Sequence, residues 1–307
     1  MVVTKVIIPA AGIGSRFLPA TKAIPKEMLP LLDRPVIQYV VEEGLRSGIK
    51  DFLMVVNRSK KVLEDHFDAA PDLEEILKQR EKSESLEALN RLSEAARFFY
   101  VRQAHPLGLG HAILMARHLV GKEHVGIMLP DDIFMGQIPA LAQLIKVATQ
   151  ERCSVIAVQE VPNNQISRYG VIGIKKQISA NLFQVREVIE KPTQSQAPSN
   201  YAIIGRYVLS PSIFASLDEM NIGALGEVQL TDGIQHMILQ GEKVFAYKVS
   251  GIRYDTGTPL EWLKANVALA LKHPQFADQM TEYLNELDRD LLLMQGRAEF
   301  LGKRMTP

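Results

Sequence analysis

Residues 5–30, KVIIPAAGIGSRFLPATKAIPKEMLP, decide the fold of this 307-residue chain. The segment opens with the apolar run Val6-Ile-Ile8 and reaches small residues at Ala10-Ala-Gly12. A continuous apolar run of this kind is typical of a strand that is buried on both faces. Glycines, cations and prolines follow the run directly. We therefore expect the first strand of a parallel sheet, with a ligand-binding loop at its carboxyl end.

Strand-like and helix-like patterns alternate outward from this segment. Helices are expected over 35–47, 60–67 and 111–120, and strands over 52–56, 98–102 and 125–129. The first of these helices has a proline at its start and Gly48 just past its end. Because strands that alternate with helices form right-handed βαβ crossovers, we predict an α/β fold. Its Rossmann-like central sheet should be mixed, mostly parallel and flanked by helices.

Two regions depart from this alternation. Residues 72–97 are rich in Glu, Lys, Arg and Leu, with apolar residues at roughly helical spacing, which predicts a helical insertion. Beyond residue 154 the chain is richer in strands, expected over 154–160, 170–174, 183–189 and 201–209. Further helices are expected over 211–219, 230–239, 259–271 and 275 to about 294.

The composition excludes several classes of protein. Thirty-five Lys and Arg balance thirty-five Asp and Glu, so no net charge attracts the chain to nucleic acid or to an anionic membrane. The longest stretch without these residues has about fourteen residues, whereas a membrane-spanning helix needs about twenty apolar ones. The apolar run after Lys5 is too short for a signal peptide, and the single Cys153 permits no internal disulfide. We expect a cytoplasmic protein with small-molecule partners, no nucleic acid and no membrane.

The loop after the first strand has the residue types of a phosphate site. Gly12 and Gly14 let backbone N–H groups approach a ligand closely, and Arg16, Lys22 and Lys26 can neutralise phosphate oxygens. The dinucleotide fingerprint requires a third glycine or alanine where this chain has a phenylalanine, and the Walker spacing is also absent. The loop therefore matches neither of these two phosphate-binding motifs.

A pair of carboxylates follows the buried strand expected over 125–129. At least one of Asp131 and Asp132 should emerge at the carboxyl edge of the sheet, beside the glycine loop. Mg²⁺ prefers one or two carboxylates together with substrate phosphates and water, which suits Asp131 with the distant Asp255. We favour Asp131 over Asp132 as the ligand, because Asp132 can instead cap the following helix or turn; the choice between them stays open.

Several motifs along the chain resemble the signature of the sugar nucleotidyltransferases, and most closely that of their bacterial uridylyltransferase branch. The loop contributes Gly-x-Gly-(Ser/Thr)-Arg-x-Leu-Pro-x-Thr-Lys-x-x-Pro-Lys-Glu-Met-Leu-Pro. The other matches, in the order of the family, are Val101-Arg-Gln-Ala-His-Pro-Leu-Gly-Leu-Gly-His-Ala112, Leu129-Pro-Asp-Asp132, Tyr169-Gly-Val-Ile172, Val188-Ile-Glu-Lys-Pro192, Pro198-Ser-Asn200, Ile204-Gly-Arg-Tyr207, Glu227-Val-Gln-Leu-Thr-Asp232 and Tyr254-Asp-Thr-Gly257. The resemblance covers roughly residues 3–270.

This resemblance implies the nucleotide-diphospho-sugar transferase fold and a reaction. The phosphate of glucose 1-phosphate would attack the α-phosphorus of UTP with Mg²⁺ as cofactor, giving UDP-glucose and pyrophosphate without a covalent enzyme intermediate. A catalytic domain would span residues 1–272, with a nucleotide-binding half over about 1–150 and a strand-rich sugar-binding half over about 151–272. Residues 273–307 would form a helical extension. Apolar residues near 284–294 suggest that this extension packs on the body or on another subunit, in a homodimer or homotetramer.

The resemblance also implies roles for individual residues. On the nucleotide side, Arg16 and Lys26 correspond to the cations at the triphosphate and Gln103 to the side chain that reads the uracil edge. The nucleotide's backbone contacts would come from Ala11, Gly12, Gly14 and Gly108. On the sugar side, Lys191 corresponds to the lysine that meets the sugar phosphate, and Glu190 to the acceptor from sugar hydroxyls. Gly170 and Ile203 complete that side, and Asp131 and Asp255 would bind the metal. Glu227 and Asp232 also match, but either can instead cap the helix expected at 230–239.

Three alternatives remain open at this stage. A thymidylyltransferase making dTDP-glucose shares the glycine loop and the Glu-Lys-Pro and Asp-Thr-Gly stretches. A regulatory relative that binds nucleotide sugars without turnover would carry altered loop and sugar-site residues, whereas Arg16 and Gly170 are intact here. An oxidoreductase of the dinucleotide-binding kind is disfavoured by the missing third glycine.

Overall fold

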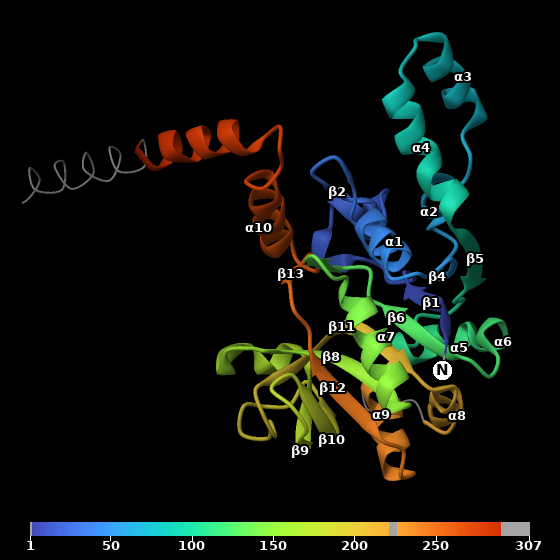
Figure 1. Ribbon diagram of the computed structural model, residues 1–307, viewed down its shortest axis with the longest axis vertical. Coiled ribbons are helices and arrows are strands. Elements are labelled where there is room, and N and C mark those ends of the chain that lie inside the picture. Colours follow the sequence, from blue (N-terminus) through green and yellow to red (C-terminus); the bar gives the residue numbers. More distant parts are fainter. Residues whose placement is uncertain (1, 221–225, 290–307) are drawn as a thin grey trace, which may run out of the picture.

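The computed structural model describes residues 2–220 and 226–289 of the chain. Nine strands of these residues form one sheet, in the order β5-β4-β1-β6-β11-β8-β12-β10-β9 (Figure 1). Neighbours β5, β4, β1 and β6 are mutually parallel, as are β8 and β12. By contrast, β11 runs antiparallel to β6 and β8, and β10 to β12 and β9. The prediction of a mixed, mostly parallel sheet is confirmed.

The nine strands of the sheet have the following bounds: β1 Val3–Pro9, β4 Asp51–Val56, β5 Arg97–Arg102, β6 His124–Met128, β8 Ser154–Glu160, β9 Gly170–Gln177, β10 Leu182–Glu190, β11 Tyr201–Leu209 and β12 Val244–Lys248. Two small sheets stand beside the large one. They pair β7 (Asp132–Met135) with β13 (Ile252–Asp255), and β2 (Pro30–Leu31) with β3 (Arg34–Pro35).

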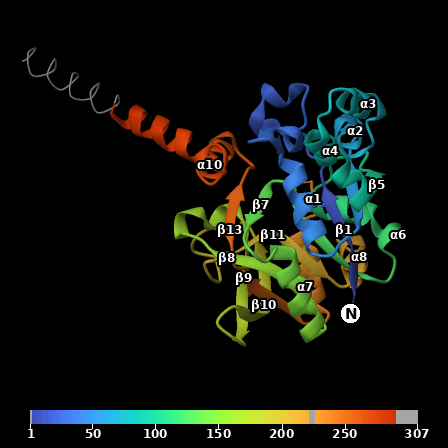
Figure 2. The ribbon, with the colours of Figure 1, turned by 45° about the horizontal axis from the view of Figure 1, so that its top comes forward.

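Helices cover both faces of the sheet. Their bounds are α1 Val36–Arg46, α2 Lys61–Phe67, α3 Pro71–Gln79, α4 Ser83–Ala95, α5 Leu109–Met115, α6 Arg117–Val120, α7 Ala140–Glu151, α8 Ser212–Asp218, α9 Leu230–Leu239 and α10 Pro259–Ala270. The core residues of α1, α2 and α7 belong to one hydrophobic cluster, and those of α5, α8 and α9 belong to another. The sheet therefore lies between two layers of helices (Figure 2).

The first strand shows why an apolar run predicts a central position. Val6 and Ile8 of β1 enter one hydrophobic cluster, while Ile7 between them enters the other, and all three are fully buried. Successive side chains of a strand point to opposite faces, so a strand with helices on both sides needs apolar residues at every position. Burial of this run fixes β1 in the interior of the sheet.

The order of the strands creates a switch point at the carboxyl end of β1. From β1 the chain continues to β4 and then β5 on one side, whereas β6 lies on the other side of β1. In open α/β sheets, ligands bind outside the carboxyl ends of strands where the order reverses in this way. Both the loop after β1 and the turn after β6 start there, which makes this edge the expected site of chemistry.

Most expected elements are present, with small shifts at their ends. Strands β8 and β11 and helix α9 have the predicted bounds, and the helix expected over 111–120 consists of α5 and α6. The predicted insertion over 72–97 corresponds to α3 and α4, which pack on each other and stand out from the body beyond β5 (Figure 1). The sequence patterns missed α7 and the short or late strands β2, β3, β7, β12 and β13.

The described part of the C-terminal region leads away from the body. A helix covers 277–289, and the predicted end of this helix near 294 lies outside the described residues. Figure 1 shows α10 and this helix as an arm on the side of the molecule away from α3 and α4. No helix among the residues that the structure describes is long and apolar enough to span a membrane.

We expect the thiol of Cys153 to resist labelling in the folded protein. The residue is 8% exposed, and burial, aided by the charge of Glu151, raises the pKa of its thiol to about 12. Since the thiolate is the reactive form, an aromatic disulfide reagent at pH 8 should react on the order of 1000-fold more slowly than after unfolding in urea. Equal rates in the two states would contradict the burial of this side chain.

Candidate active site

The loop after β1 folds back on itself and brings Lys26 to the edge of the sheet. Gly14 has a φ of +75°, a conformation that glycine adopts without strain. Its carbonyl oxygen accepts a hydrogen bond of 2.7 Å from Thr21 Oγ1. A Cβ atom at Gly14 would lie 3.3 Å from the Cβ of Lys26. The glycine thus permits the close turn that places the lysine next to the start of its own loop.

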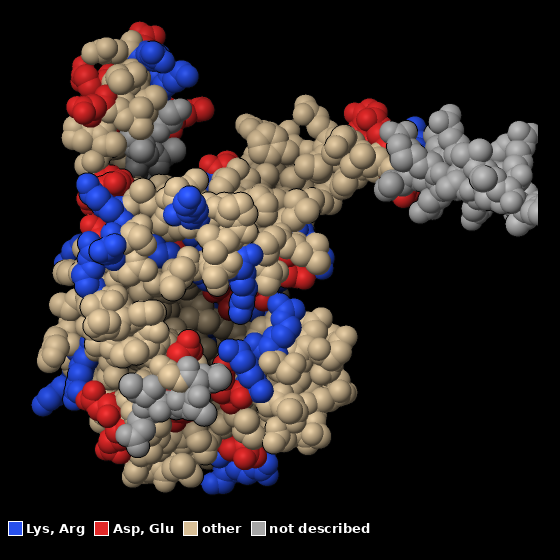
Figure 3. Space-filling view, turned by 180° about the vertical axis from the view of Figure 1, so that it is seen from behind, with Lys and Arg blue, Asp and Glu red and all other residues tan. Residues whose placement is uncertain are grey.

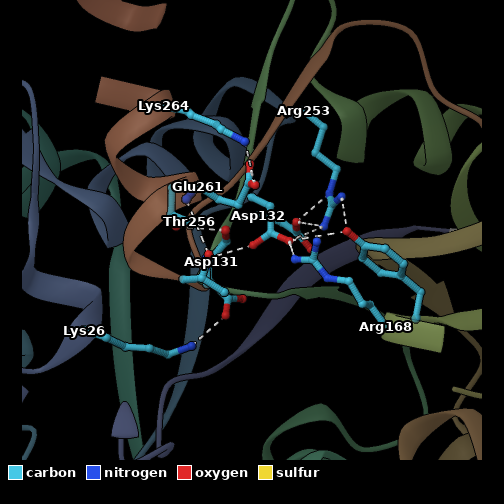
Figure 4. A network of polar contacts seen from close by, with 12 residues as sticks. Lys26, Asp131, Asp132, Arg168, Arg253, Thr256, Glu261 and Lys264 are labelled. Atoms are coloured by element: carbon cyan, nitrogen blue, oxygen red, sulfur yellow. Dashed lines mark hydrogen bonds and ion pairs between the residues drawn. The ribbon is translucent and has the colours of Figure 1, made fainter. Parts of the chain in front are cut away.

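Lys26 is bonded to the first of the two predicted carboxylates. Its Nζ donates to Asp131 Oδ2 at 2.6 Å, across 105 residues of sequence (Figure 4). Burial alone would lower the pKa of Lys26, but the carboxylates of Asp131 and Glu27 together outweigh it and raise that pKa above its usual value. For Asp131 the signs are reversed: burial alone would raise its pKa, but the charge of Lys26 and the hydrogen bond from it lower that pKa below its usual value. Both groups are therefore charged at neutral pH.

A second ion pair fixes the residue that follows Lys26 in the chain. Lys60 donates to Glu27 Oε2 at 2.7 Å, and both side chains are almost fully buried, with 3% and 1% of their areas exposed. Glu27 lies in the short 3₁₀ helix Lys26–Met28, directly after Lys26. Because an unpaired buried carboxylate is costly, the pair fixes this turn of the loop against the body.

The turn that carries Asp131 is held by a buried arginine of β11. The guanidinium of Arg206 donates to the carbonyl oxygens of Leu129 at 3.0 Å and of Asp132 at 2.7 Å, one on each side of Asp131. It is fully buried and forms an ion pair of 2.8 Å with Glu43 of α1, which is also buried. Arg206 therefore fixes both ends of the turn at the carboxyl end of β6.

Next to Arg206, the backbone of β11 is irregular. Gly205 has a φ of +37°, and a Cβ atom there would collide with the carboxylate of Asp132. The register of β11 against β8 shifts between Ile203 and Tyr207. Glycine is required here because the strand passes so close to the turn.

The small sheet of β7 and β13 brings Asp255 to the same place. In its register Asp255 lies opposite Asp132, and Thr256 donates to the carbonyl oxygen of Asp131 through both its N–H (2.8 Å) and its Oγ1 (2.9 Å). A Cβ atom at Gly257 would lie 3.0 Å from Asp255 Oδ1, 3.4 Å from Asp131 Oδ2 and 3.7 Å from a guanidinium nitrogen of Arg16. These three charged groups therefore surround one point.

Asp132 has a different environment from Asp131. Its Oδ1 accepts hydrogen bonds from Arg253 at 2.6 Å, in an ion pair whose shortest contact is 2.5 Å. Burial raises the pKa of Asp132 to about 6, and the nearby Asp131 and Asp255 carboxylates add to the effect, while Arg253 opposes it. Asp132 begins strand β7 and its carboxylate accepts from Arg253, so the alternative that it caps a following helix or turn is wrong.

A solvent-open cavity of about 760 Å³, which we call the central cavity, lies in front of these groups. Arg16, Asp131 and Asp255 line it, together with Gly170, Glu190 and Ile203. The face in Figure 3 is hollowed at mid-height, with acidic and basic side chains around the hollow. A Cβ atom at Gly170 would lie 2.7 Å from Thr231 Cγ2, so a larger residue at this position would collide with the wall of the cavity. Residues predicted for the phosphate, metal and sugar sites thus meet in one cavity, although Lys26, which is bonded to Asp131, is not among the residues that line it.

Lys191 follows Glu190 in the chain and is not among the residues that line this cavity. Its Nζ lies 3.4 Å from Glu190 Oε1, and its side chain is about half exposed. Glu190 also accepts a hydrogen bond of 3.0 Å from Thr231 Oγ1 of α9. The backbone of Lys191 has a φ of +43°, which is strained for a lysine, and strain of this kind persists where the surroundings fix it.

A second cavity, which we call the loop cavity, is lined by two of the residues predicted for the nucleotide side. Ala11 and Gln103 line it together with Asn57, whose Nδ2 donates to the carbonyl oxygen of Ala11 at 2.7 Å. Gly108 lies at the start of α5 with a φ of +97° and is close to Gln103, whose Nε2 donates to its carbonyl oxygen at 3.1 Å. Gly12 is exposed at the mouth of the loop, and a Cβ atom there would meet open space.

Asp131 and Asp255 present oxygen donors of the kind that Mg²⁺ prefers. Both face the central cavity, in which a phosphorylated ligand can supply further oxygens. Within the described residues, no three His, Cys, Asp or Glu side chains gather to hold an ion by themselves. The donors fit a metal that is shared between protein and substrate.

Several residues of the site were not identified from the sequence. Arg168 and Tyr169 approach Asp255 at 3.5 Å, Arg253 neutralises Asp132, and Arg206 holds the turn. One signal was available: a charged residue inside the apolar strand 201–209 indicates a buried, paired group. Glu227 and Asp232 do not cap α9, since its N-cap residue is Gln229, with no hydrogen bond from its side chain.

Comparison with known proteins gives a consistent result. A model of the nucleotidyl transferase family matches residues 5–272. A UTP–glucose-1-phosphate uridylyltransferase from Bacillus subtilis (strain 168) is 44% identical over 285 residues, which are 93% of this chain and 97% of that protein.

Solved structures are similar over the same length. A UDP-glucose pyrophosphorylase complexed with UDP-glucose is 38% identical, with a TM-score of 0.80 over 89% of this chain and 100% of that one. A UTP-bound enzyme of the same name from Acinetobacter baumannii is 34% identical, with a TM-score of 0.86 over 93% of this chain and 100% of that one.

We expect Glu43→Leu to lower the free energy of unfolding by about 3–5 kcal/mol, because it leaves the buried Arg206 without a counter-charge. It also removes the acceptor for the N–H of Leu141 at the start of α7. As a control, Glu261→Leu removes a carboxylate from the exposed pair with Lys264 and should cost no more than about 1 kcal/mol. Urea unfolding measures both changes, and a similar cost for the two variants would contradict a structural role for the buried pair.

Proposed function

This chain belongs to the nucleotidyl transferase family, and from this we propose that it transfers the uridylyl group of UTP to glucose 1-phosphate. An oxygen of the sugar phosphate attacks the α-phosphorus of UTP, and the bond from that phosphorus to the pyrophosphate oxygen breaks. The products are UDP-glucose and pyrophosphate, without a covalent enzyme intermediate. The observation that carries this proposal is the convergence of Arg16, Asp131 and Asp255 on one point of the central cavity.

Charge is the main obstacle to this reaction. The attacking phosphate and the triphosphate repel each other, and the leaving pyrophosphate gathers negative charge. Arg16 and Lys26 are assigned to the triphosphate, where fixed cations offset the repulsion and stabilise the leaving group. Lys26 suits this role because its ammonium group is already bonded to Asp131 at the edge of the sheet before substrate arrives. The ion pair of the next residue, Glu27, with Lys60 fixes the backbone there.

Asp131 and Asp255 would hold Mg²⁺ together with substrate phosphate oxygens. Bound there, the ion would neutralise phosphate charge and help to align the reacting groups. Asp132 is not assigned to the metal, because Arg253 already occupies its carboxylate. Asp131 lies nearer to the cations of the loop, which supports it as the ligand from this pair.

The two cavities suggest how the substrates are divided. The loop cavity, formed within residues 1–150, would take the nucleoside, with Ala11 and Gln103 against it. The sugar would lie in the part of the central cavity formed by residues 151–272, where Glu190 accepts from its hydroxyls and Gly170 lets it approach the backbone. Lys191, whose Nζ lies near Glu190, is assigned to the phosphate of the sugar.

We expect the purified chain to release pyrophosphate from UTP and glucose 1-phosphate, and to stop when EDTA removes the divalent ion. Competition between UTP and dTTP at limiting concentration should favour UTP. Equal or better use of dTTP would support the thymidylyltransferase instead. Binding of UTP without any release of pyrophosphate would support the regulatory relative.

Lys26→Ala and Asp131→Ala should each lower kcat by about 100-fold to 1000-fold, the cost of losing one preorganised electrostatic partner of the transition state. Lys264→Ala, which removes an exposed lysine of α10, is the matched control and should keep nearly normal turnover. Thermal unfolding of each variant checks that it is folded. Near-normal kcat in a folded Lys26→Ala or Asp131→Ala variant would contradict the assigned role.

A further inference from the structure

The side-chain amide of Gln103 has a fixed orientation in the loop cavity. Gln103 follows β5, is 6% exposed, and its backbone N–H donates to the carbonyl oxygen of Val56 at 2.9 Å. One atom of its amide lies 3.1 Å from the carbonyl oxygen of Gly108. A carbonyl oxygen can only accept, so this atom must be the nitrogen Nε2.

The same nitrogen has a second partner on helix α5. His111 Nδ1 lies 2.9 Å from Gln103 Nε2. Because an amide nitrogen donates and does not accept, His111 Nδ1 must be the unprotonated, accepting nitrogen of a neutral imidazole. Burial, with a further contribution from the charge of His105, lowers the pKa of His111, which agrees with a neutral ring. Both hydrogens of the Gln103 amide are thus engaged by the protein.

Only the amide oxygen of Gln103 is left for a ligand. Within the described residues this oxygen accepts no hydrogen bond from the protein. It is not sealed in the interior either, because the fully buried polar side-chain atoms without a partner are Glu27 Oε1, Tyr100 OH and His236 Nδ1. Gln103 therefore offers an acceptor, and no donor, to the loop cavity.

An acceptor at this place distinguishes pyrimidine bases. The Watson–Crick edge of uracil carries a single donor, the N3–H, between two carbonyl oxygens. In cytosine N3 is itself an acceptor and the donor is the N4 amino group in place of O4, so cytosine bound in the position of uracil would face the Gln103 oxygen at N3 with no hydrogen between them. A site built to accept a hydrogen bond rejects an analogue that cannot donate it, because the buried acceptor is left unpaired. Thymine has the same N3–H, so this contact does not separate UTP from dTTP.

We propose that His111 is a positioning residue that holds the Gln103 amide with its oxygen toward the base, and that it thereby favours uracil over cytosine nucleotides. The proposal rests on the proposed use of UTP and adds a specificity determinant to it. His111 does not itself contact the substrate. It acts by accepting a hydrogen bond from one of the two amide hydrogens, which opposes rotation of the amide group.

Two substitutions of similar shape separate this role from simple packing. His111→Leu removes the accepting nitrogen, whereas His111→Asn can place an amide oxygen near the position of Nδ1. Both variants keep a branched side chain at this position of α5, and thermal unfolding reports whether each is folded. His118→Leu, on the exposed surface of α6, controls for the loss of a histidine elsewhere.

The measurement is kcat/KM with UTP and with CTP, each with glucose 1-phosphate, using the full-length chain. In His111→Leu we expect the preference for UTP over CTP to fall about fivefold or more, the effect of losing one hydrogen bond. His111→Asn should restore most of that preference, and His118→Leu should leave it unchanged. Equal losses for both nucleotides in His111→Leu, or an unchanged ratio, would overturn the proposal.

A second readout keeps this test separate from the proposed function. Calorimetric titration of UTP and CTP into the same variants measures the base preference without turnover. If the unmodified chain binds UTP over CTP but releases no pyrophosphate, the proposed reaction fails and the role of His111 can still be judged. If the unmodified chain turns over UTP while His111→Leu keeps its full preference, only the role of His111 fails.

Discussion

The buried ion pair between Arg206 and Glu43 is the constraint on which the rest of the site depends. Taking a guanidinium and a carboxylate out of water costs several kcal/mol for each ion, and the cost is offset only where every polar hydrogen finds an acceptor. Here the guanidinium donates to both oxygens of Glu43 and to the carbonyl oxygens of Leu129, Gly205 and Asp132. The pair thus joins α1, β11 and the turn after β6, and no one of these can shift without leaving a buried charge unsatisfied.

A second buried ion pair, Lys60 with Glu27, fixes the loop after β1, just as Arg206 fixes the turn after β6. The two supported segments meet in the bond between Lys26 and Asp131. Neither buried pair lines the central cavity. Their contribution to chemistry is to fix the positions of Asp131, which lines that cavity, and of Lys26, which is bonded to Asp131, so that little reorganisation remains when a triphosphate binds. Electrostatic stabilisation of a transition state is largest when the charged groups are already in place.

The sequence could predict the layers of this fold, but not all of its contacts. Burial on both faces leaves a continuous apolar run, and β1 was predicted from that run. Strands β7 and β13, in contrast, have four residues each, which is too short for a clear periodic pattern. They pair across more than a hundred residues, so the local sequence does not predict their pairing. The groups around the central cavity were named from motifs, whereas Arg206 and Arg253 were missed because their partners are distant in sequence. The resemblance assigns Gln103 to the uracil edge without saying which atom of its amide takes part, and the structure leaves only the oxygen for a ligand.

That difference at Gln103 illustrates a general feature of this site. A polar side chain is ambiguous in sequence because it can donate or accept, rotate or pair. Its neighbours remove the ambiguity when they have a fixed polarity: a backbone carbonyl can only accept, and a guanidinium can only donate. The carbonyl oxygen of Gly108 defines which atom of the Gln103 amide is the nitrogen. Arg253 forms an ion pair with Asp132, so that Asp131 is the carboxylate of the two that lies next to the cations of the loop. The chemistry offered to a ligand is therefore what remains after the protein has satisfied its own buried groups.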